Sequence, residues 1–268
     1  MKKVVLITGV SSGFGKYTAE LLSLNGFIVY GTSRKSGSSE VSFNMLQMDV
    51  TNQESIIQGV DKIIQKEGRL DILINNAGMG ITGSIEDASI DEAKLQMDTN
   101  FYGIVHTVSA VLPMMHKQGA GTIINFSSIG GLMGLPYQGF YSASKFAVEG
   151  YSHSLRMELK NSGINIVLIN PGDFNTQFTA NRLIASKTKA GSAYEAQFKK
   201  SIAIIEKDES GGLHPSLMAK KILSILGTKK PCFRYVVSTA EQKLAVLLKN
   251  ILPDAWFYKI IEDHYGIK

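Results

Sequence analysis

The chain has 268 residues, of which 44% are hydrophobic and 19% are charged, a balance typical of a globular protein that buries a full core. Its single cysteine, Cys232, excludes an internal disulfide, and no run approaches the roughly eighteen apolar residues that span a bilayer. The net charge of +5 arises entirely in residues 211–268, which contain nine basic and four acidic residues. We therefore expect a soluble, cytoplasmic protein without a nucleic-acid partner.

Apolar runs alternate with segments of helical period from the first residues onward. Six runs are typical of short buried strands: "VVLIT", "FIVYGTS", "MLQMD", "LDILIN", "GTIINFS" and "INIVLIN". Helical patterns occupy about 14–25, 53–67, 91–117 and 142–161. This alternation predicts an α/β fold, a doubly wound parallel sheet of the Rossmann type with helices on both faces. No linker or repeat divides the chain, so we expect one domain, 1–268.

The pattern loosens after the sixth apolar run. Residues 173–214 are polar, and a helix near 215–227 and a strand "FRYVV" follow. A segment beyond the carboxyl end of a parallel strand lies where such sheets bind ligands. We expect a substrate lid at 173–214 and a basic C-terminal extension at about 231–268.

A glycine turn, "TGVSSGFG", follows the first predicted strand and opens the first helix. Its glycines permit a tight turn and close approach of the backbone to a pyrophosphate at the helix N-terminus. The spacing is G-x-x-x-G-x-G, not the commoner G-x-G-x-x-G, and a purely structural turn is the alternative. The cofactor-binding candidates here are Gly9, Ser11, Ser12, Gly13, Phe14 and Gly15.

The end of the second predicted strand carries Ser33, Arg34 and Lys35. An NAD enzyme places an acid there to hold the ribose 2'-hydroxyl, whereas a guanidinium pairs with a 2'-phosphate. These residues predict NADP(H); the alternative is a solvated cation at a turn.

Several motifs in order resemble the short-chain dehydrogenase/reductase family over nearly the whole chain. They are "TGVSSGFG", "DVT", "NNAG", "DTN", "FSS", the pair Tyr141 and Lys145, and "PGDFNT". The resemblance implies that Ser128, Tyr141, Lys145 and Asn100 are catalytic, although a helix-stabilising role for Asn100 is nearly as good an interpretation. It also implies that the cofactor is held by Asp49, Val50, Asn75, Ala77, Gly78, Tyr141, Lys145, Pro171, Gly172 and Thr176. Phe14 departs from the isoleucine usual in this turn.

The pair Tyr141 and Lys145 lies four residues apart on one predicted helix face. A free phenol has a pKa near 10, and a fixed cation lowers it, so we expect Lys145 to make Tyr141 a better acid. By the resemblance, Tyr141 donates a proton to a carbonyl oxygen that Ser128 also hydrogen-bonds. We expect an enzyme that interconverts a ketone or aldehyde and an alcohol.

The segment around Tyr141 resembles the 17β-hydroxysteroid and retinol dehydrogenase branch most closely. The substrate-binding candidates are Met79, Ser128, Met133, Leu135, Phe174 and Phe178. Thioether and aromatic side chains suit a bulky apolar molecule, so a steroid-, retinoid- or lipid-like substrate is expected. Simple core packing of these side chains is the alternative.

Two further functions compete with this one: a 3-oxoacyl-thioester reductase and a non-catalytic NADP(H) sensor. The longer lid opposes the first, and the presence of both Tyr141 and Lys145 opposes the second. The resemblance implies a homodimer or homotetramer formed through helices 91–117 and 142–161. The extension, "KLAVLLKNILPDAWFYKI", suits a membrane-surface helix, but packing on the protein's own body is the favoured interpretation.

Overall fold

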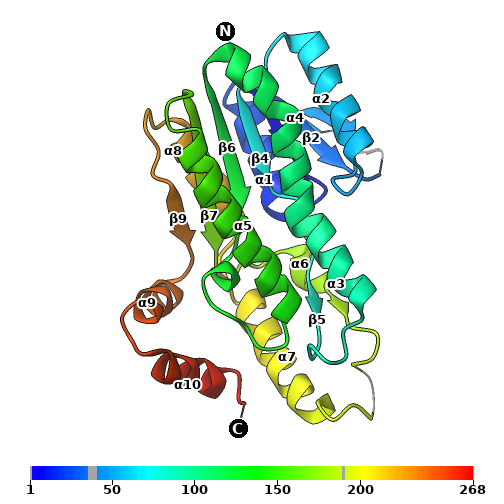
Figure 1. Cartoon of the computed structure of the whole chain (residues 1–268), viewed down its shortest axis with the longest axis vertical. Helices are drawn as coiled ribbons and strands as arrows, with labels where there is room; N and C mark the ends of the chain where they lie inside the picture. The colour runs from blue at the N-terminus through cyan, green and yellow to red at the C-terminus, as the bar shows by residue number, and fades with distance from the viewer. Residues whose placement is uncertain (1, 36–40, 189–190, 268) are drawn as a thin grey trace.

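The computed structural model describes residues 2–35, 41–188 and 191–267. Its centre is a seven-stranded parallel sheet in the order β3-β2-β1-β4-β6-β7-β9 (Figure 1). The strands are β1 (Val4–Ile7), β2 (Ile28–Ser33), β3 (Asn44–Gln47), β4 (Ile72–Asn75), β6 (Gly121–Phe126), β7 (Ile164–Pro171) and β9 (Arg234–Val237). The chain runs outward from β1 to β2 and β3, and then crosses back to place β4 on the other side of β1. Because the strand order reverses at this point, ligands are expected at the carboxyl ends of β1 and β4.

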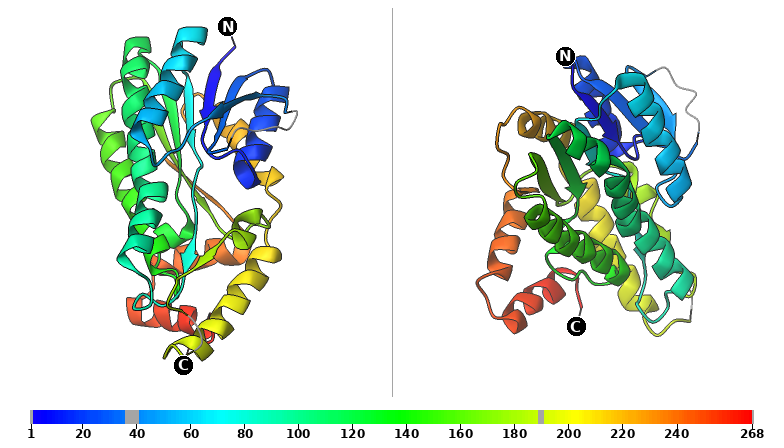
Figure 2. Two further views of the ribbon diagram at one scale, coloured as in Figure 1. Left: turned by 90° about the vertical axis from the view of Figure 1, so that its right-hand side faces the viewer. Right: turned by 45° about the horizontal axis from the view of Figure 1, so that its top comes forward.

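Helices cover both faces of the sheet, as the side view in Figure 2 shows. On one face, α2 (Gln53–Glu67), α4 (Gly103–Gln118) and α5 (Gly139–Glu158) pack on Leu6 and Leu73. On the other face, α1 (Gly13–Leu24) and α8 (Ser216–Leu226) pack on Val5 and Ile74. Successive strand residues point to opposite faces, so each central strand serves two cores and is apolar throughout. The predicted doubly wound architecture is confirmed.

The predicted helix 91–117 differs from the structure. It consists of α3 (Ile90–Met97), a π-helical turn at Asp98–Tyr102, and α4. Helix α3 begins with a capping box in which Ser89 and Glu92 satisfy each other's backbone amides. A π turn keeps the chain helical and in effect inserts one residue, so the helical apolar period continues on both sides of it. The sequence pattern therefore could not separate the three pieces.

The lid contains more regular structure than its polar sequence indicates. It holds α6 (Gln177–Ala180), β8 (Leu183–Ile184) and α7 (Glu195–Ser210). Strand β8 pairs in parallel with β5 (Ile81–Thr82), which fixes the lid to the loop after β4. The lid is thus tied to the body by backbone hydrogen bonds, such as Leu183 N to Gly80 O at 3.0 Å.

The C-terminal extension folds back on the lid as α9 (Ala240–Lys249) and α10 (Asp254–His264), at the end of the molecule opposite α2 (Figure 1). Phe257 is buried, Ser201 donates to the carbonyl of Tyr265 at 3.0 Å, and His264 Nε2 lies 2.9 Å from Asp208. The extension therefore packs on the protein's own body, as favoured from the sequence.

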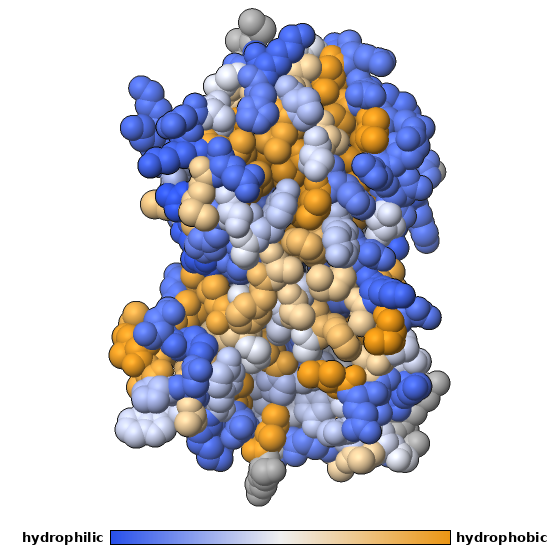
Figure 3. Space-filling view, viewed as in Figure 1, coloured by the Kyte–Doolittle hydropathy of each residue, from blue (hydrophilic) through white to orange (hydrophobic). Residues whose placement is uncertain are grey.

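Part of the surface remains apolar (Figure 3). On α9 and α10 the exposed large side chains are Leu244, Leu247, Trp256 and Ile260. These helices and their flanks, 239–267, carry three lysines against four acidic residues, so the basic surplus lies in 220–234 instead. Among the helices of the described ranges, none combines the length and apolar character needed to cross a membrane.

Candidate active site

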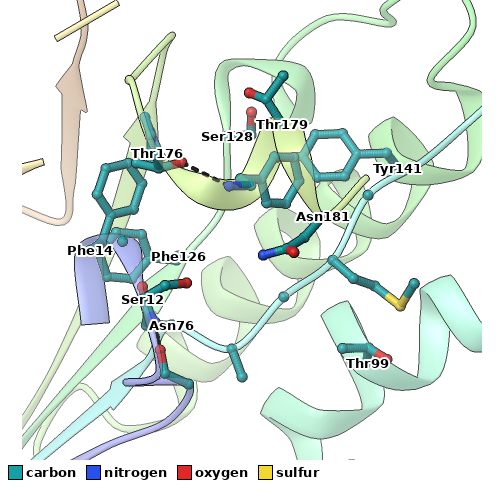
Figure 4. Close-up of a pocket in the computed structure, with 18 of the residues that line it drawn as sticks. Ser12, Phe14, Asn76, Thr99, Phe126, Ser128, Tyr141, Thr176, Thr179 and Asn181 are labelled. Carbon is teal, nitrogen blue, oxygen red and sulfur yellow. Dashed lines mark hydrogen bonds between the residues drawn. The ribbon is translucent and has the colours of Figure 1, made fainter. Parts of the chain in front are cut away.

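The carboxyl ends of the central strands border a cavity of about 780 Å³ (Figure 4). Ser12 and Phe14 lie on one side of it, and Ser128, Tyr141 and Thr179 lie on the other. The cavity collects most of the residues expected from the sequence: Gly9, Ser11, Ser12, Gly13, Phe14, Ser33, Arg34, Asp49, Val50, Ala77, Gly78, Met79, Ser128, Leu135, Tyr141, Lys145, Pro171, Gly172, Phe174, Thr176 and Phe178.

The glycine turn is built for close backbone approach. Gly9 and Gly13 have φ of 73° and 54°, a region that other residues rarely adopt. A Cβ on Gly9 would come within 2.8 Å of the Cα of Ala77. The side-chain amide of Asn76 donates to the carbonyls of Thr8 and Gly9 at 2.9 and 2.8 Å, which holds the turn open. The N-terminus of α1 therefore faces the cavity, an arrangement that suits an anion.

Two cations, Arg34 and Lys35, lie at the far end of the cavity beyond Ser33. Asp49 is on the opposite wall, where its Oδ1 accepts hydrogen bonds from the backbone and hydroxyl of Thr51 at 2.9 and 2.8 Å. This end of the cavity thus offers two positive side chains, neither of which forms an ion pair with a residue that the structure describes.

Ser128, Tyr141 and Lys145 meet at the other end. Ser128 follows β6, its hydroxyl hydrogen-bonds that of Tyr141, and the Nζ of Lys145 lies 5.7 Å from the centre of the Tyr141 ring. Lys145 is 6% exposed and donates to the carbonyl of Phe126 at 3.0 Å. One turn of α5 separates the phenol from the ammonium, so both face the same cavity.

The acidity of Tyr141 differs from the expectation. Burial raises the pKa of Tyr141 to about 12, and the Ser128 hydrogen bond lowers it only in part. Burial also lowers the pKa of Lys145, and the negative charge of Glu149 opposes part of this shift, so the resulting pKa is about 8. The expected depression of the phenol pKa is therefore wrong for this arrangement. Near neutral pH the phenol carries its proton, the state that a proton donor needs.

Asn100 does not line the cavity, because it is fully buried in the π turn. Its Oδ1 accepts from the amide of Met79 at 2.9 Å, and its Nδ2 donates to the Met79 carbonyl at 3.0 Å. A Cβ on Gly78 would lie 3.3 Å from this Oδ1 and 3.9 Å from the Nζ of Lys145. The π turn thus places Asn100 next to Lys145 across Gly78.

Three other expected residues lie outside the cavity. Asn75 is 2% exposed and belongs to a core network, in which it donates to Asn125 at 2.9 Å and accepts from Thr107 at 2.7 Å. Its neighbour Asn76 lines the cavity instead. Gly15 packs against the carbonyl of Gly9, and Met133 is buried in the body. Adjacent side chains at the end of β4 point in opposite directions, so Asn76, and not Asn75, reaches the cavity.

Several cavity residues were missed from the sequence. They come from the lid and the extension: Asp173, Thr179, Asn181, Ile205, Asp208, Glu209 and Tyr265. No local pattern marks these positions, because helix α7 and the C-terminal segment reach the cavity only through tertiary packing. Phe14 contacts Phe126 and Phe174 at ring-centre distances of 5.7 and 4.8 Å, so it packs at the border of the cavity.

Comparison with known proteins places this geometry among similar chains. Residues 3–186 match the model of a family described as short chain dehydrogenase. A 3-ketodihydrosphingosine reductase from Bacteroides thetaiotaomicron is 50% identical over 99% of both chains. An uncharacterized oxidoreductase from Bacillus subtilis, YusZ, is 35% identical over 95% of this chain and 96% of its own. These relatives do not single out the hydroxysteroid branch.

Solved structures of short-chain dehydrogenases have a fold similar to that of this chain. A short-chain dehydrogenase from Streptomyces avermitilis superposes with a TM-score of 0.82 at 27% identity, covering 98% of this chain and 96% of its own. The NADP-bound structure of ElxO gives 0.71 at 28% identity, covering 88% and 97%. A dehydrogenase/reductase from Burkholderia phymatum in complex with NAD gives 0.79 at 25% identity, covering 93% of each chain.

Proposed function

Because the chain belongs to the short-chain dehydrogenase family and is an oxidoreductase, we propose that it is an NADPH-dependent ketone reductase of a long-chain lipid. The observation that carries the proposal is the meeting of Ser128, Tyr141 and Lys145 in one cavity, with the phenol protonated. That protonation state favours reduction, in which the ketone oxygen must receive a proton.

The residues present fit a nicotinamide dinucleotide. The open glycine turn and the α1 N-terminus suit the pyrophosphate, and Arg34 with Lys35 suits an additional 2'-phosphate. Lys145, Gly172 and Thr176 would hold the nicotinamide end. The bound cofactor supplies the hydride. In this arrangement Tyr141 donates the proton, and Ser128 hydrogen-bonds the oxygen on which charge develops.

An apolar, extended substrate is supported by apolar side chains in the lining of the cavity. Met79, Leu135, Leu183 and Phe178 are among them, and the Phe178 ring lies 5.8 Å from that of Tyr141. Such side chains suit an alkyl chain. The name of the Bacteroides relative adds support for 3-ketodihydrosphingosine in particular.

The proposal is tested by NADPH oxidation with 3-ketodihydrosphingosine, using the unmodified chain and Tyr141→Phe. We expect turnover to fall by at least about a thousandfold in the variant, since the proton donor is lost, while NADPH affinity stays within about threefold. Equal turnover by both proteins would remove Tyr141 from this role. NADPH binding without turnover in the unmodified chain would favour the sensor alternative.

A further inference from the structure

The cavity has an acidic corner beside Tyr141 that proton and hydride transfer leave unexplained. We define it as Asp173, two residues after the end of β7, together with Asp208 and Glu209 near the end of α7; all three line the cavity. The negative charges of Glu209 and Asp173 both raise the pKa of Tyr141. The corner is therefore within electrostatic reach of the hydroxyl that meets the substrate carbonyl.

The acidic corner is short of positive charge. Glu209 pairs with Arg182 and accepts the hydroxyl of Thr179, and Asp208 lies 2.9 Å from His264 Nε2. Asp173 accepts its hydrogen bond from the neutral amide of Gln242, at 2.6 Å, and no Lys or Arg within the described ranges pairs with it. Burial, then the charges of Glu209 and Asp208, raise the pKa of Asp173 to about 6. A cation brought in by a ligand would relieve this crowding.

Arg182 gives an independent indication of a ligand. Its side chain is 3% exposed, and its Nη2 forms an ion pair with Glu209. Its Nε and Nη1 have no hydrogen-bond partner among the residues that the structure describes. The guanidinium carbon lies 5.8 Å from the Phe178 ring, which also contacts Tyr141. Arg182 does not itself line the cavity, but it contacts Glu209 and Phe178, which both do. Buried N–H groups without an acceptor are costly, so a ligand oxygen that reaches them from the cavity between these two residues would be stabilised.

We propose that the acidic corner and Arg182 recognise an amino alcohol attached directly to the substrate ketone. Asp173 and Glu209 bind an ammonium on the carbon next to the carbonyl, and the free N–H groups of Arg182 donate to the neighbouring hydroxyl. The substrate class is a long-chain 2-amino-1-hydroxy-3-ketone, which includes 3-ketodihydrosphingosine. This inference rests on the proposed reductase activity and deepens it, because it explains how one end of an apolar lipid is oriented.

The test compares two substrates of equal chain length: 3-ketodihydrosphingosine and its N-acetyl derivative, which keeps the ketone and hydroxyl but loses the positive charge. NADPH oxidation gives kcat/KM for each at pH 7. We expect the unmodified chain to prefer the free amine by about 10- to 100-fold, the range for losing a charged hydrogen bond. In Asp173→Asn, which keeps the shape and the Gln242 contact, we expect most of this preference to disappear.

Glu206→Gln is the matched control, because Glu206 is exposed on α7 one turn before Glu209 and does not line the cavity. Its substrate preference should stay within about twofold of the unmodified chain. Glu209→Gln, checked by thermal unfolding, provides a second variant that should also lose the preference. Equal kcat/KM for both ketones in the unmodified chain, or an unchanged preference in Asp173→Asn, overturns the inference and leaves the reductase intact. Reduction of neither ketone, with NADPH bound, overturns the reductase itself.

Discussion

At the scale of single residues, we predict that the charge of Lys145 sets the pH range in which the site reduces a ketone. Its pKa is lowered to about 8 by burial, so the ammonium is present below that pH and is lost as the pH rises through it. Tyr141 stays protonated throughout, since its pKa is about 12. We expect kcat/KM for ketone reduction to fall above about pH 8. The charge of Glu149 raises the pKa of Lys145, so Glu149→Gln should move this fall to lower pH.

Glu149 lies one turn beyond Lys145 and does not line the cavity, so we expect it to act through Lys145 and not on substrate. Its Oε1 accepts from Asn170 at 2.6 Å and its Oε2 pairs with Arg234 at 2.6 Å, while Asn170 also donates to the Ser128 carbonyl at 2.9 Å. Glu158→Gln, exposed on the same helix, is the control for the pH profile. A profile that is identical in Glu149→Gln and Glu158→Gln would show that Lys145 does not set it.

We predict that Arg34 gives the protein its preference for NADPH over NADH. Its exposed guanidinium borders the cavity beyond β2, where a 2'-phosphate would lie. Arg34→Ala would lose a charge-assisted hydrogen bond to phosphate, so we expect the Kd for NADPH to rise by roughly 10- to 100-fold. The Kd for NADH should change by less than about threefold. Titration of nicotinamide fluorescence measures both affinities. Equal losses for NADPH and NADH would remove the assignment of NADP(H).

At the scale of elements, the sequence predicted the central strands and the main helices well, because parallel strands buried on both faces are continuous apolar runs. "GTIINFS" and "INIVLIN", for example, became β6 and β7. The π turn around Asn100 was not predictable, since it changes hydrogen bonding more than apolar period. The acidic corner was equally hidden, because Asp173 and Glu209 lie far apart in sequence and meet only through the packing of α7.

Helix α10 is held to the body chiefly by Phe257, which is 1% exposed. In Phe257→Ala we expect α10 to lose roughly 3 kcal/mol of docking free energy, the usual cost of truncating a buried aromatic. Hydrogen exchange of 254–267 should then accelerate. The KM for long-chain ketone should rise, because Tyr265 and the partner of Asp208 belong to this segment. Trp256→Ala, at a neighbouring residue that is 68% exposed, is the control, and equal acceleration there would contradict this account.

At the scale of the whole molecule, we predict self-association through the α4 and α5 surface, as the family resemblance implies. Phe146 and Met157 on α5 are 46% and 70% exposed, and Tyr102 in the adjoining π turn is 47% exposed. Apolar side chains on a shared face are typical of isologous contacts. We expect a homo-oligomer by light scattering, and Phe146→Glu should shift it toward monomer. A monomeric unmodified chain at micromolar concentration would contradict the prediction.

The docked extension also carries the only tryptophan of the chain, Trp256. Indole emission overlaps the absorption of reduced nicotinamide, whereas tyrosines emit elsewhere. Energy transfer from this one fluorophore therefore reports how far α10 lies from a bound dinucleotide, and its polarisation reports how tightly the helix is seated. The intrinsic fluorescence of Trp256 can therefore measure movement of the extension during a catalytic cycle, without an attached label.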